Sequence, residues 1–484
     1  GAFYCLGGGP PAMHDLRSTA APETDVVIGF VGGGSRDWAS KLMHALALTD
    51  SFGGTGRLYD LDHESARTNA ELGREIQRQD ATVGDWTYEP VESLSAALDG
   101  ADFVVCSTQD PPAETMAKDL DIPQEYGVYQ TVGDTVGPGG AMRALRSVPQ
   151  YREVAAAVRE HCPDAWVFNF TNPMTVCTRT LYEEYPDINA IGICHEVYHV
   201  QEWLTELAAE HLSIDDAGYE EVDVTVKGIN HFTWIDEATL RGRDLFEAVD
   251  AELAARDPPS FEPGDMAAES FFVDNNEITL DLYRRYGVLP AAGDRHLAEF
   301  VPHYLGPVNE PAEIHRWGIQ LTPSEYRVDT WPEAEREREA KLRGDEPITV
   351  AEPDEEMVEM MAALLGHGAV KTNVNVPNRG QVQALPEGAV VETNALLTRD
   401  SVTPLSAGGL PDPIESTVRT HVANQETLVE AGFSGDLDLA FRAFRNDPLV
   451  DLDPTEARSL FAGLVDAQRE YLADYDVADF DAAP

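Results

Sequence analysis

A strand, a glycine-rich turn and a helix follow one another in DVVIGFVGGGSRDWASKLMHALALTD, residues 25–50. An apolar β-type run leads into glycines and then into apolar residues at helical spacing. GRLYDLDHESARTNAELGREI (56–76) repeats this pattern, and GADFVVCSTQ (100–109) and AWVFNFTNP (165–173) read as two further buried strands. Strands that alternate with helices form a parallel, right-handed, doubly wound sheet. Residues 25–200 are therefore predicted to be a Rossmann-like domain.

The second half of the chain has a different pattern. Longer helical segments alternate with β-type pieces such as EVDVTVKGINHFTW (221–234) and GAVVETNALL (388–397). We predict a mixed α+β substrate and catalytic domain over residues 201–484. Two segments within it, RDPPSFEPGD (256–265) and RVDTWPEAEREREAKLRGDEP (327–347), are predicted to be surface excursions.

The opening GAFYCLGGGPPAM lacks the basic start and apolar stretch of a signal peptide. We predict that residues 1–24 are a disordered or tag-derived extension and that Met13 is the natural start. No run reaches the roughly 18 apolar residues that a membrane helix needs, so no membrane partner is expected. The 5 cysteines have no paired spacing, which indicates a reducing compartment, and we expect a cytoplasmic protein.

The charge of the chain limits its partners. Lys and Arg number 34 against 86 Asp and Glu, a formal net charge of -52 that is spread along the 484 residues. Nucleic acid is therefore excluded as a partner. A surface so rich in carboxylates suits a halophilic, high-salt cytoplasm, because salt screens its self-repulsion.

The first glycine-rich turn has part of a dinucleotide fingerprint. Gly32 and Gly34 occupy its first two glycine positions, but the third position holds Asp37. Asp60 ends the next predicted strand, where a carboxylate accepts the ribose hydroxyls of NAD and disfavours the 2′-phosphate of NADP. The predicted cofactor-binding residues are Gly32, Gly33, Gly34, Ser35 and Asp60.

A cysteine and two histidines also follow predicted strands. Cys194 and His195 come directly after AIGI (190–193), and His231 follows VDVTVKG (222–228). Loops at the carboxyl ends of parallel strands carry function, so Cys194 and His231 could share one metal ion. Alternatively, Cys194 is a small buried hydrophobic residue and His231 a hydrogen-bonded core residue.

The order of the motifs resembles glycoside hydrolase family 4, the NAD- and metal-dependent glycosidases. The resemblance runs from about Val26 to Tyr471. Its pieces are GGGS, YDLD, DIPQEYGVYQTVGDTVGPGGAMRALRSVP, NFTNPMTV, GICHEV, GINHFTW, GDRHLAEFVP and NVPNRGQVQALPEGAVVE, in family order. The resemblance implies that Cys194 and His231 hold a divalent ion, usually Mn²⁺, and that Asn172 contacts the sugar. It also implies NAD as cofactor and a homo-oligomer, either a dimer or a tetramer.

The resemblance implies an unusual glycosidase mechanism, which departs from the two-carboxylate scheme. NAD takes a hydride from C3 of the sugar, and the new ketone acidifies the proton at C2. A base removes that proton while the metal holds the enediolate. The C1 leaving group is eliminated, water adds, and the hydride returns to C3. A soft thiolate and one imidazole bind manganese weakly, so substrate oxygens and water are expected to complete the metal shell.

The acid and the base of this mechanism are chosen from a few residues. An imidazole with a pKa near its ordinary ~6.5 could protonate a leaving oxygen, so His195 is a candidate acid, or it binds sugar hydroxyls. For the base, Tyr286, Asp294 and His296 are candidates, and we favour Asp294. His296 is also a candidate substrate-binding residue.

Three more charged residues lie in the shared motifs or, for Asp119, two residues before one of them. Asp119 matches an acidic residue of the family and is a catalytic candidate, although a solvated helix face would explain it as well. Arg143 follows the GPGGAM turn, where it could clamp an anionic substrate or pair with a surface acid. Asp134 belongs to a GDT sequence that stands where many relatives have ETT, so the comparison assigns it no role.

The residues after Cys194 bear on the sugar. CHEV resembles the subgroup that acts on α-galacturonides, whereas CHSV relatives take neutral α-glucosides or α-galactosides. Relatives with Asp or Asn after the cysteine take phosphorylated sugars, which His195 argues against. Glu196 is a predicted substrate-binding residue, but as an anion it must point away from a uronate or pair with Arg143 or Arg295. An α-glucuronidase, α-galactosidase or α-glucosidase of the same family is the alternative.

Two functions of other classes are also considered. Lactate and malate dehydrogenases share the fold, so a metal-independent NAD-dependent 2-hydroxy acid dehydrogenase is possible, and it would release NADH in each turnover. A non-catalytic NAD-binding sensor would bind the cofactor without metal dependence. Cys194 together with His231 argues against the dehydrogenase.

Overall fold

The computed structural model describes residues 23–109, 113–261, 274–305, 314–351 and 356–477, with Phe272 and Phe480. Its parallel strands have the order β3-β2-β1-β4-β5-β6, the order of a doubly wound dinucleotide-binding sheet. The strands are β1 (Glu23–Val31), β2 (Phe52–Tyr59), β3 (Trp86–Pro90), β4 (Phe103–Cys106), β5 (Trp166–Asn169) and β6 (Asn189–Gly192). The predicted parallel, doubly wound fold is confirmed.

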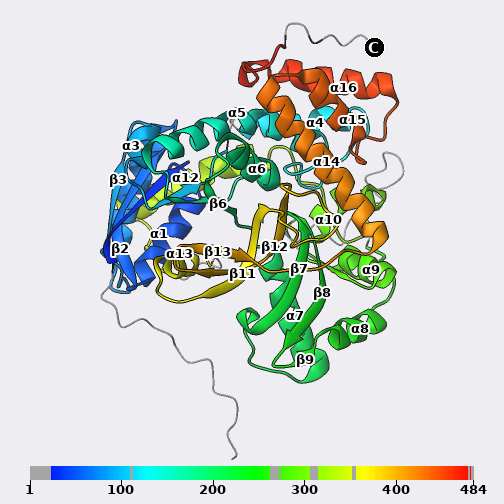
Figure 1. The fold of residues 1–484 in the computed structure, drawn as a ribbon, viewed down its shortest axis with the longest axis horizontal. Helices are drawn as coiled ribbons and strands as arrows, with labels where there is room; N and C mark the ends of the chain where they lie inside the picture. Colours follow the sequence, from blue (N-terminus) through cyan, green and yellow to red (C-terminus); the bar gives the residue numbers. More distant parts are fainter. Residues whose placement is uncertain are drawn as a thin grey trace, which may run out of the picture.

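Helices connect these strands in the expected alternation (Figure 1). They are α1 (Trp38–Leu48), α2 (His63–Ile76), α3 (Leu94–Leu98), α4 (Ala113–Gln124), α5 (Gly137–His161) and α6 (Met174–Glu184). The apolar run of β1 is buried at Val26, Ile28 and Phe30, which are 2% exposed or less. A strand covered by helices on both faces is expected to read as such an apolar run.

The second half extends the same sheet with antiparallel strands. These are β7 (Val222–Ile229), β8 (Phe232–Leu240), β9 (Arg243–Asp244), β10 (Leu289–Pro290), β11 (Val370–Pro377), β12 (Val390–Thr398) and β13 (Ser401–Pro404). Strand β11 joins β6 through the pair Asn375 and Gly192. The described strands therefore form one 13-stranded sheet through both halves. The predicted mixed α+β character of the second half is confirmed.

The remaining helices pack around this extension. They are α7 (Glu196–Leu212), α8 (Phe246–Ala255), α9 (Glu277–Tyr286), α10 (Asp294–Phe300), α12 (Tyr326–Arg343), α13 (Met357–Leu365), α14 (Asp412–Ser434), α15 (Leu437–Asn446) and α16 (Pro454–Ala467). Short 3₁₀ turns are η1 (Tyr219–Glu221), η2 (Pro302–Leu305) and η3 (Arg469–Tyr471). Helices α14 and α15 pack on α5 (Figure 1). Because α7 spans residue 200, the predicted boundary between residues 200 and 201 falls inside a helix.

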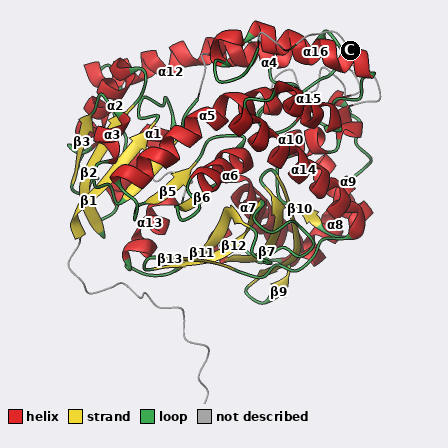
Figure 2. Ribbon diagram, turned by 45° about the horizontal axis from the view of Figure 1, so that its top comes forward, coloured by secondary structure: helices red, strands yellow, loops and turns green. Residues whose placement is uncertain are grey.

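The structure corrects one prediction about the surface. Residues 327–347 were expected to be an excursion, but residues 326–343 form α12, which lies against α2 and α4 (Figure 2). The helix carries no apolar stripe that its sequence would reveal, and it is held in part by buried polar contacts of Arg338. The other predicted excursion, 256–265, has no helix or strand at 256–261, and its remainder lies outside the described residues.

Two further predictions touch the chain ends and the cysteines. Residues 1–22 and Cys5 lie outside the described residues, whereas β1 begins at Glu23, two residues before the predicted start. The other four cysteines, Cys106, Cys162, Cys177 and Cys194, are buried and free. Among the described helices, none is long and apolar enough to cross a membrane.

Candidate active site

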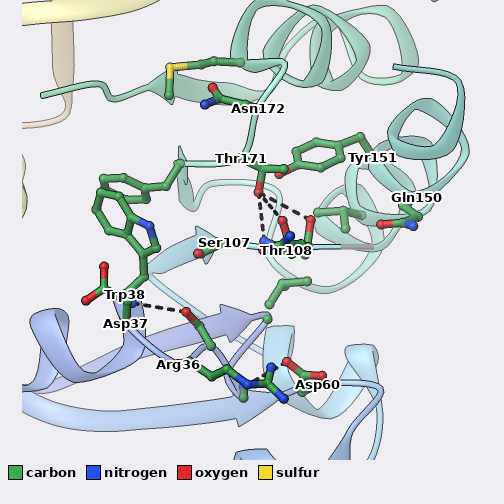
Figure 3. Close-up of a pocket in the computed structure, with 18 of the residues that line it drawn as sticks. Arg36, Asp37, Trp38, Asp60, Ser107, Thr108, Gln150, Tyr151, Thr171 and Asn172 are labelled. Carbon is green, nitrogen blue, oxygen red and sulfur yellow. Dashed lines mark hydrogen bonds between the residues drawn. The ribbon is translucent and has the colours of Figure 1, made fainter. Parts of the chain in front are cut away.

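A cavity of about 740 Å³ opens at the carboxyl ends of the parallel strands. Figure 3 shows its lining from Arg36 and Asp60 at one end to Asn172 at the other. Cys194 and His231 also line it, so residues 160 positions and more after Gly34 reach the same space. Ligands of doubly wound sheets bind at this edge.

The glycine turn and Asp60 form one rigid unit. Gly34 N donates to Asp60 Oδ2 at 2.9 Å, and Asp62 N donates to Asp60 Oδ1 at 2.9 Å. Gly32 has φ +88, and a Cβ there would lie 2.1 Å from Ser107 O. A Cβ on Gly34 would lie 2.9 Å from Asp60 Oδ2. The turn can therefore pack against Ser107 and Asp60 only because both positions are glycine.

The other predicted cofactor residues have mainly structural contacts. A Cβ on Gly33 would lie 2.8 Å from Leu58 Cα, so this glycine allows close packing on β2 and is not among the residues that line the cavity. Ser35 lines the cavity, and its Oγ accepts from Trp38 N at 3.1 Å at the start of α1.

Asp60→Ala is expected to weaken NAD binding by roughly 10-fold or more, because about 1–3 kcal/mol is lost when a buried polar partner is left unpaired. Calorimetric titration of the variant with NAD measures the loss. Asp37→Ala is the matched control, since Asp37 also lines the cavity but is exposed and pairs with Lys41 on the surface. Equal NAD affinity of wild type and Asp60→Ala would show that the ribose lies elsewhere.

His231 is held with one ring nitrogen available. It occupies the two-residue turn between β7 and β8 with φ 62, and its Nδ1 lies 2.8 Å from Thr135 Oγ1. Since Thr135 Oγ1 donates to Asp134 Oδ1 at 2.6 Å, it accepts from His231 Nδ1, and Nε2 keeps its lone pair. Burial and the neighbouring His296 lower the pKa of His231 to about 3. A neutral imidazole with a free nitrogen is the form that binds metal ions.

Cys194 supplies the second predicted ligand. It follows β6 and is 5% exposed. Burial raises the pKa of the Cys194 thiol well above its usual range, and the carboxylates of Glu392 and Glu196 add to this. A metal ion that binds here must therefore displace the thiol proton, which makes its affinity depend on pH.

Two oxygen-bearing residues complete this end of the cavity. Asn172 Nδ2 donates to Asp134 Oδ2 at 3.1 Å, while the buried Asn172 Oδ1 has no hydrogen-bond partner. Burial would raise the pKa of Asp134, but His296, His231 and Arg143 lower it overall, so Asp134 is an anion. Ligand atoms of Asp134, His231 and His296 lie within 4.8 Å of one another. Cys194 belongs to no such group among the described residues. The oxygens of Asp134 and Asn172 and the imidazole of His231 make a mixed donor set that can hold a divalent ion such as Mn²⁺.

Arg143 has a positioning contact as well as a place in the cavity. Its Nε and Nη2 donate to Asn172 O at 3.3 and 3.2 Å, and the residue is 9% exposed. Arg143 therefore holds the Asn172 turn and lines the cavity beside it. By contrast, Arg295 donates to Thr131 O and Thr322 Oγ1 and is not among the lining residues.

Of the two residues after Cys194 only the first lines the cavity, although His195 Nε2 and Glu196 Oε1 lie 3.9 Å apart. His195 lines the cavity, and burial lowers its pKa although the Glu196 carboxylate opposes this. Glu196 is not among the lining residues, and its Oε2 accepts from Gly293 N at 2.6 Å. Burial would raise the pKa of Glu196, but His296, His231 and His195 lower it to about 2. Glu196 therefore turns away from the cavity, which argues against direct contact with a substrate.

The structure argues against Asp294 as the base. Its carboxylate accepts from Ile278 N at 3.1 Å and from Thr279 N at 2.8 Å, so it caps the start of α9. Thr279 Oγ1 donates to it as well, and Asp294 is 0% exposed and not among the lining residues. A carboxylate that is occupied in this way is not placed to take a proton from a ligand in the cavity.

The other acid and base candidates differ in position. Asp119 pairs with Arg146 in the interior and is not among the lining residues, which argues against a catalytic role. Tyr286 packs edge-on against Trp234 beside the hydrophobic core. His296 stacks on His231 with the ring centroids 3.7 Å apart, and its buried Nδ1 has no hydrogen-bond partner. Of the three base candidates, His296 lies next to the predicted metal ligands.

Sequence reasoning left the role of Asp134 open. The signal that was available was the position of GDT within a motif shared with the family, although its first residue differs from the usual ETT. The contacts of Asp134 with Thr135 and Asn172, and its closeness to His231, come from three separate segments of the chain.

The sheet has the strand order of dinucleotide-binding enzymes, and its cavity is lined at one end by a cysteine, a histidine and an aspartate, which are residue types that bind metal ions. The chain belongs to glycosyl hydrolase family 4. Residues 27–210 match the family 4 glycosyl hydrolase domain, and residues 226–450 match its C-terminal domain. The resemblance predicted from the motifs is thereby confirmed, and the chain is a glycoside hydrolase.

Relatives match over nearly the whole chain. The α-galacturonidase of Thermoanaerobacterium saccharolyticum is 42% identical over 96% of this chain and 100% of its own length. That of Bacillus subtilis is 43% identical over 90% of this chain and 96% of its own. A solved structure of Bacillus subtilis lplD has a TM-score of 0.86 at 42% identity, covering 91% of this chain and 100% of that one. A 6-phospho-α-glucosidase solved with NAD and Mn²⁺ shares the fold, with a TM-score of 0.76 at 19% identity, over 93% and 99% of the two chains.

Proposed function

We propose that the protein hydrolyses α-galacturonides with NAD and Mn²⁺ as cofactors. One observation carries the proposal: a single cavity joins the glycine turn and Asp60 to Cys194 and His231. Its support in sequence is the 42% identity to an α-galacturonidase over its full length. In this proposal the protein acts on a small glycoside in the cytoplasm of a halophilic cell, as a homo-oligomer and without nucleic acid or membrane partners.

The residues of the chain divide between the two cofactors. Gly32, Gly34 and Asp60 would hold NAD, and Cys194 with His231 would hold the metal, with further oxygens from Asp134 and Asn172. When bound, NAD supplies reversible acceptance of a hydride, and the metal polarises sugar oxygens. The cysteine must stay reduced to bind a metal ion.

The remaining residues at the Asn172 end of the cavity would orient the sugar and move protons. Asn172 Oδ1, which has no partner, would accept from a sugar hydroxyl or coordinate the metal. His296, beside His231, replaces Asp294 as the proposed base, and His195 at the cavity wall is the proposed acid. His296 stacks on the predicted metal ligand His231 and His195 lies in the cavity wall, so each imidazole is placed where it could move a proton.

One cation beside Asn172 supports a uronate substrate. Arg143 is this cation in the wall of the cavity, and the Glu196 carboxylate is bound to Gly293 N outside the lining. Glu196 thus does not line the cavity, although its Oε1 stays within 3.9 Å of His195 Nε2. We propose that Arg143 receives the substrate carboxylate, as charge-assisted hydrogen bonds are the strong ones.

Release of free sugar from a chromogenic α-galacturonide tests the function. Turnover is expected with NAD and Mn²⁺ together, and it should fall to background when either is withheld. A matched α-galactoside, which has a hydroxymethyl group in place of the carboxylate, is expected to react far more slowly. Equal rates on both sugars would contradict the uronate proposal, and stoichiometric NADH accumulation would favour the hydroxy acid dehydrogenase.

Hydrolysis in heavy water is expected to place deuterium at C2 of the released sugar, because the proposed route breaks and remakes the C2–H bond. Mass spectrometry and proton NMR of the product measure the label. Direct displacement at C1 exchanges nothing at C2. Product that carries only hydrogen at C2 would therefore rule out the elimination route.

A further inference from the structure

Three residues on one face of α12 point toward the glycine turn. Trp331, Glu335 and Arg338 are separated by four and three positions, so they share a helix face. The segment lies about 270 residues after Asp60 in the chain, and its helix rests on α2. No motif of the sequence connected it to the cofactor.

The first contact is made by Arg36, the residue that follows the glycine turn. Its guanidinium lies 4.5 Å from the centroid of the Trp331 ring, and its Nε donates to Glu335 Oε1 at 3.1 Å. Arg36 and Trp331 both line the cavity, together with Asp60. Figure 3 shows Arg36 beside Asp60. The half-buried ring of Trp331 thus contributes to the wall of the cavity next to the proposed ribose position.

The second contact reaches the glycine turn itself. Arg338 is 9% exposed, and its Nη1 donates to Asn69 Oδ1 at 2.8 Å. Asn69 Nδ2 donates in turn to Gly33 O and to Ser35 O, each at 2.8 Å. A chain of buried hydrogen bonds therefore connects α12 to the carbonyl groups of the turn.

We propose that α12 completes the adenosine half of the NAD site, with Trp331 and Arg36 forming the wall that receives the adenine ring. A flat guanidinium and an indole suit a purine, because both stack on aromatic faces. Glu335 and Arg338 are positioning residues that hold Arg36 and the turn. The inference rests on the proposed use of NAD. Because the cofactor is regenerated in each turnover, tight binding of its adenosine half, which lies away from the sugar, would keep it bound from one turnover to the next.

The test uses two halves of the cofactor. ADP-ribose and nicotinamide mononucleotide are titrated separately into the full-length protein by calorimetry at constant ionic strength. Trp331→Ala is expected to weaken ADP-ribose binding about 10-fold, the order expected from the loss of one stacking contact, and to leave mononucleotide binding unchanged. Trp331→Phe is expected to restore most of the affinity. Glu337→Gln, on an exposed position of the same helix, is the matched control and should bind like the wild type.

Several outcomes would overturn the inference. They are wild-type ADP-ribose affinity in Trp331→Ala, an equal loss for both halves of the cofactor, or an equal effect of Glu337→Gln.

Glu335→Gln removes the ion pair of Arg36 without changing the indole. Like Trp331→Ala, it should weaken ADP-ribose binding, so the test does not depend on the folding of one variant. Failure of the wild type to bind ADP-ribose would overturn the NAD proposal and this inference together. Failure to release galacturonate with ADP-ribose binding intact would contradict only the proposed function.

Discussion

Cys194→Ser is expected to lower kcat/KM on an α-galacturonide by about 1000-fold or more in the presence of Mn²⁺. A metal that polarises a carbonyl oxygen contributes several kcal/mol to the barrier, and each ~1.36 kcal/mol is tenfold in rate. Serine keeps the size of cysteine but is not a thiolate at neutral pH. Steady-state rates across a Mn²⁺ titration, with bound metal measured by mass spectrometry, give the loss. The midpoint of unfolding of the metal-free protein is expected to stay close to that of the wild type.

Cys162→Ser provides the matched control for this experiment. Cys162 is also buried and free, at 4% exposed, but it ends α5 and is not among the residues that line the cavity. The same chemical change there should leave the activity of the folded enzyme near the wild-type value. A Cys194→Ser enzyme with full activity after chelation and return of Mn²⁺ would show that the metal is held elsewhere.

Asp119→Ala is expected to destabilise the protein by about 3–5 kcal/mol, the usual result when one partner of a buried ion pair is removed. Arg146 Nη2 lies 2.7 Å from Asp119 Oδ2, and the two side chains are 0% and 2% exposed. Gln468 Nε2 donates to Asp119 Oδ1 at 2.7 Å, so one carboxylate joins α4, α5 and the end of α16. Urea unfolding at constant salt measures the change in free energy.

The same variant separates two roles of Asp119. Asp121→Ala, an exposed position of the same helix, is the control and should change stability by less than about 0.5 kcal/mol. With a structural role, the folded fraction of Asp119→Ala keeps its turnover number. Loss of turnover with an unchanged unfolding midpoint would instead identify Asp119 as a catalytic residue, the candidate role that the family resemblance suggested.

The sequence patterns predicted most of the fold that positions the site. The strand and helix of residues 25–50, the strand that leads to Asp60 and the strand before Cys194 all lie where their patterns place them. The segment 327–347 was predicted only as a surface excursion, and the helix α12 was not predicted, because a highly charged segment without an apolar stripe shows no helical periodicity. Its position depends on Arg338, whose partner Asn69 is 269 residues away.

The carboxylates likewise include one whose place the sequence predicted and two whose place only the structure shows. Asp60 was assigned from its place at a strand end, and the structure finds it bonded to Gly34 N, since both belong to one local strand-turn-helix unit. Asp294 lies in a shared motif and Asp119 two residues before one, and both looked catalytic, yet their oxygens are occupied by the start of α9 and by Arg146 with Gln468. Nothing in a motif shows whether a carboxylate faces a cavity or a helix end.

The sequence by itself determined the parallel sheet, the glycine turn with Asp60 and the residues that follow each strand, because alternation, helical spacing and turn glycines act between near neighbours. Tertiary structure alone decided which side chains share the cavity. It placed Asp134 beside His231, turned Glu196 toward Gly293 and brought Trp331 to Arg36. These contacts join segments far apart in the chain. Their geometry depends on how the second half extends the sheet, and local sequence patterns do not predict that packing.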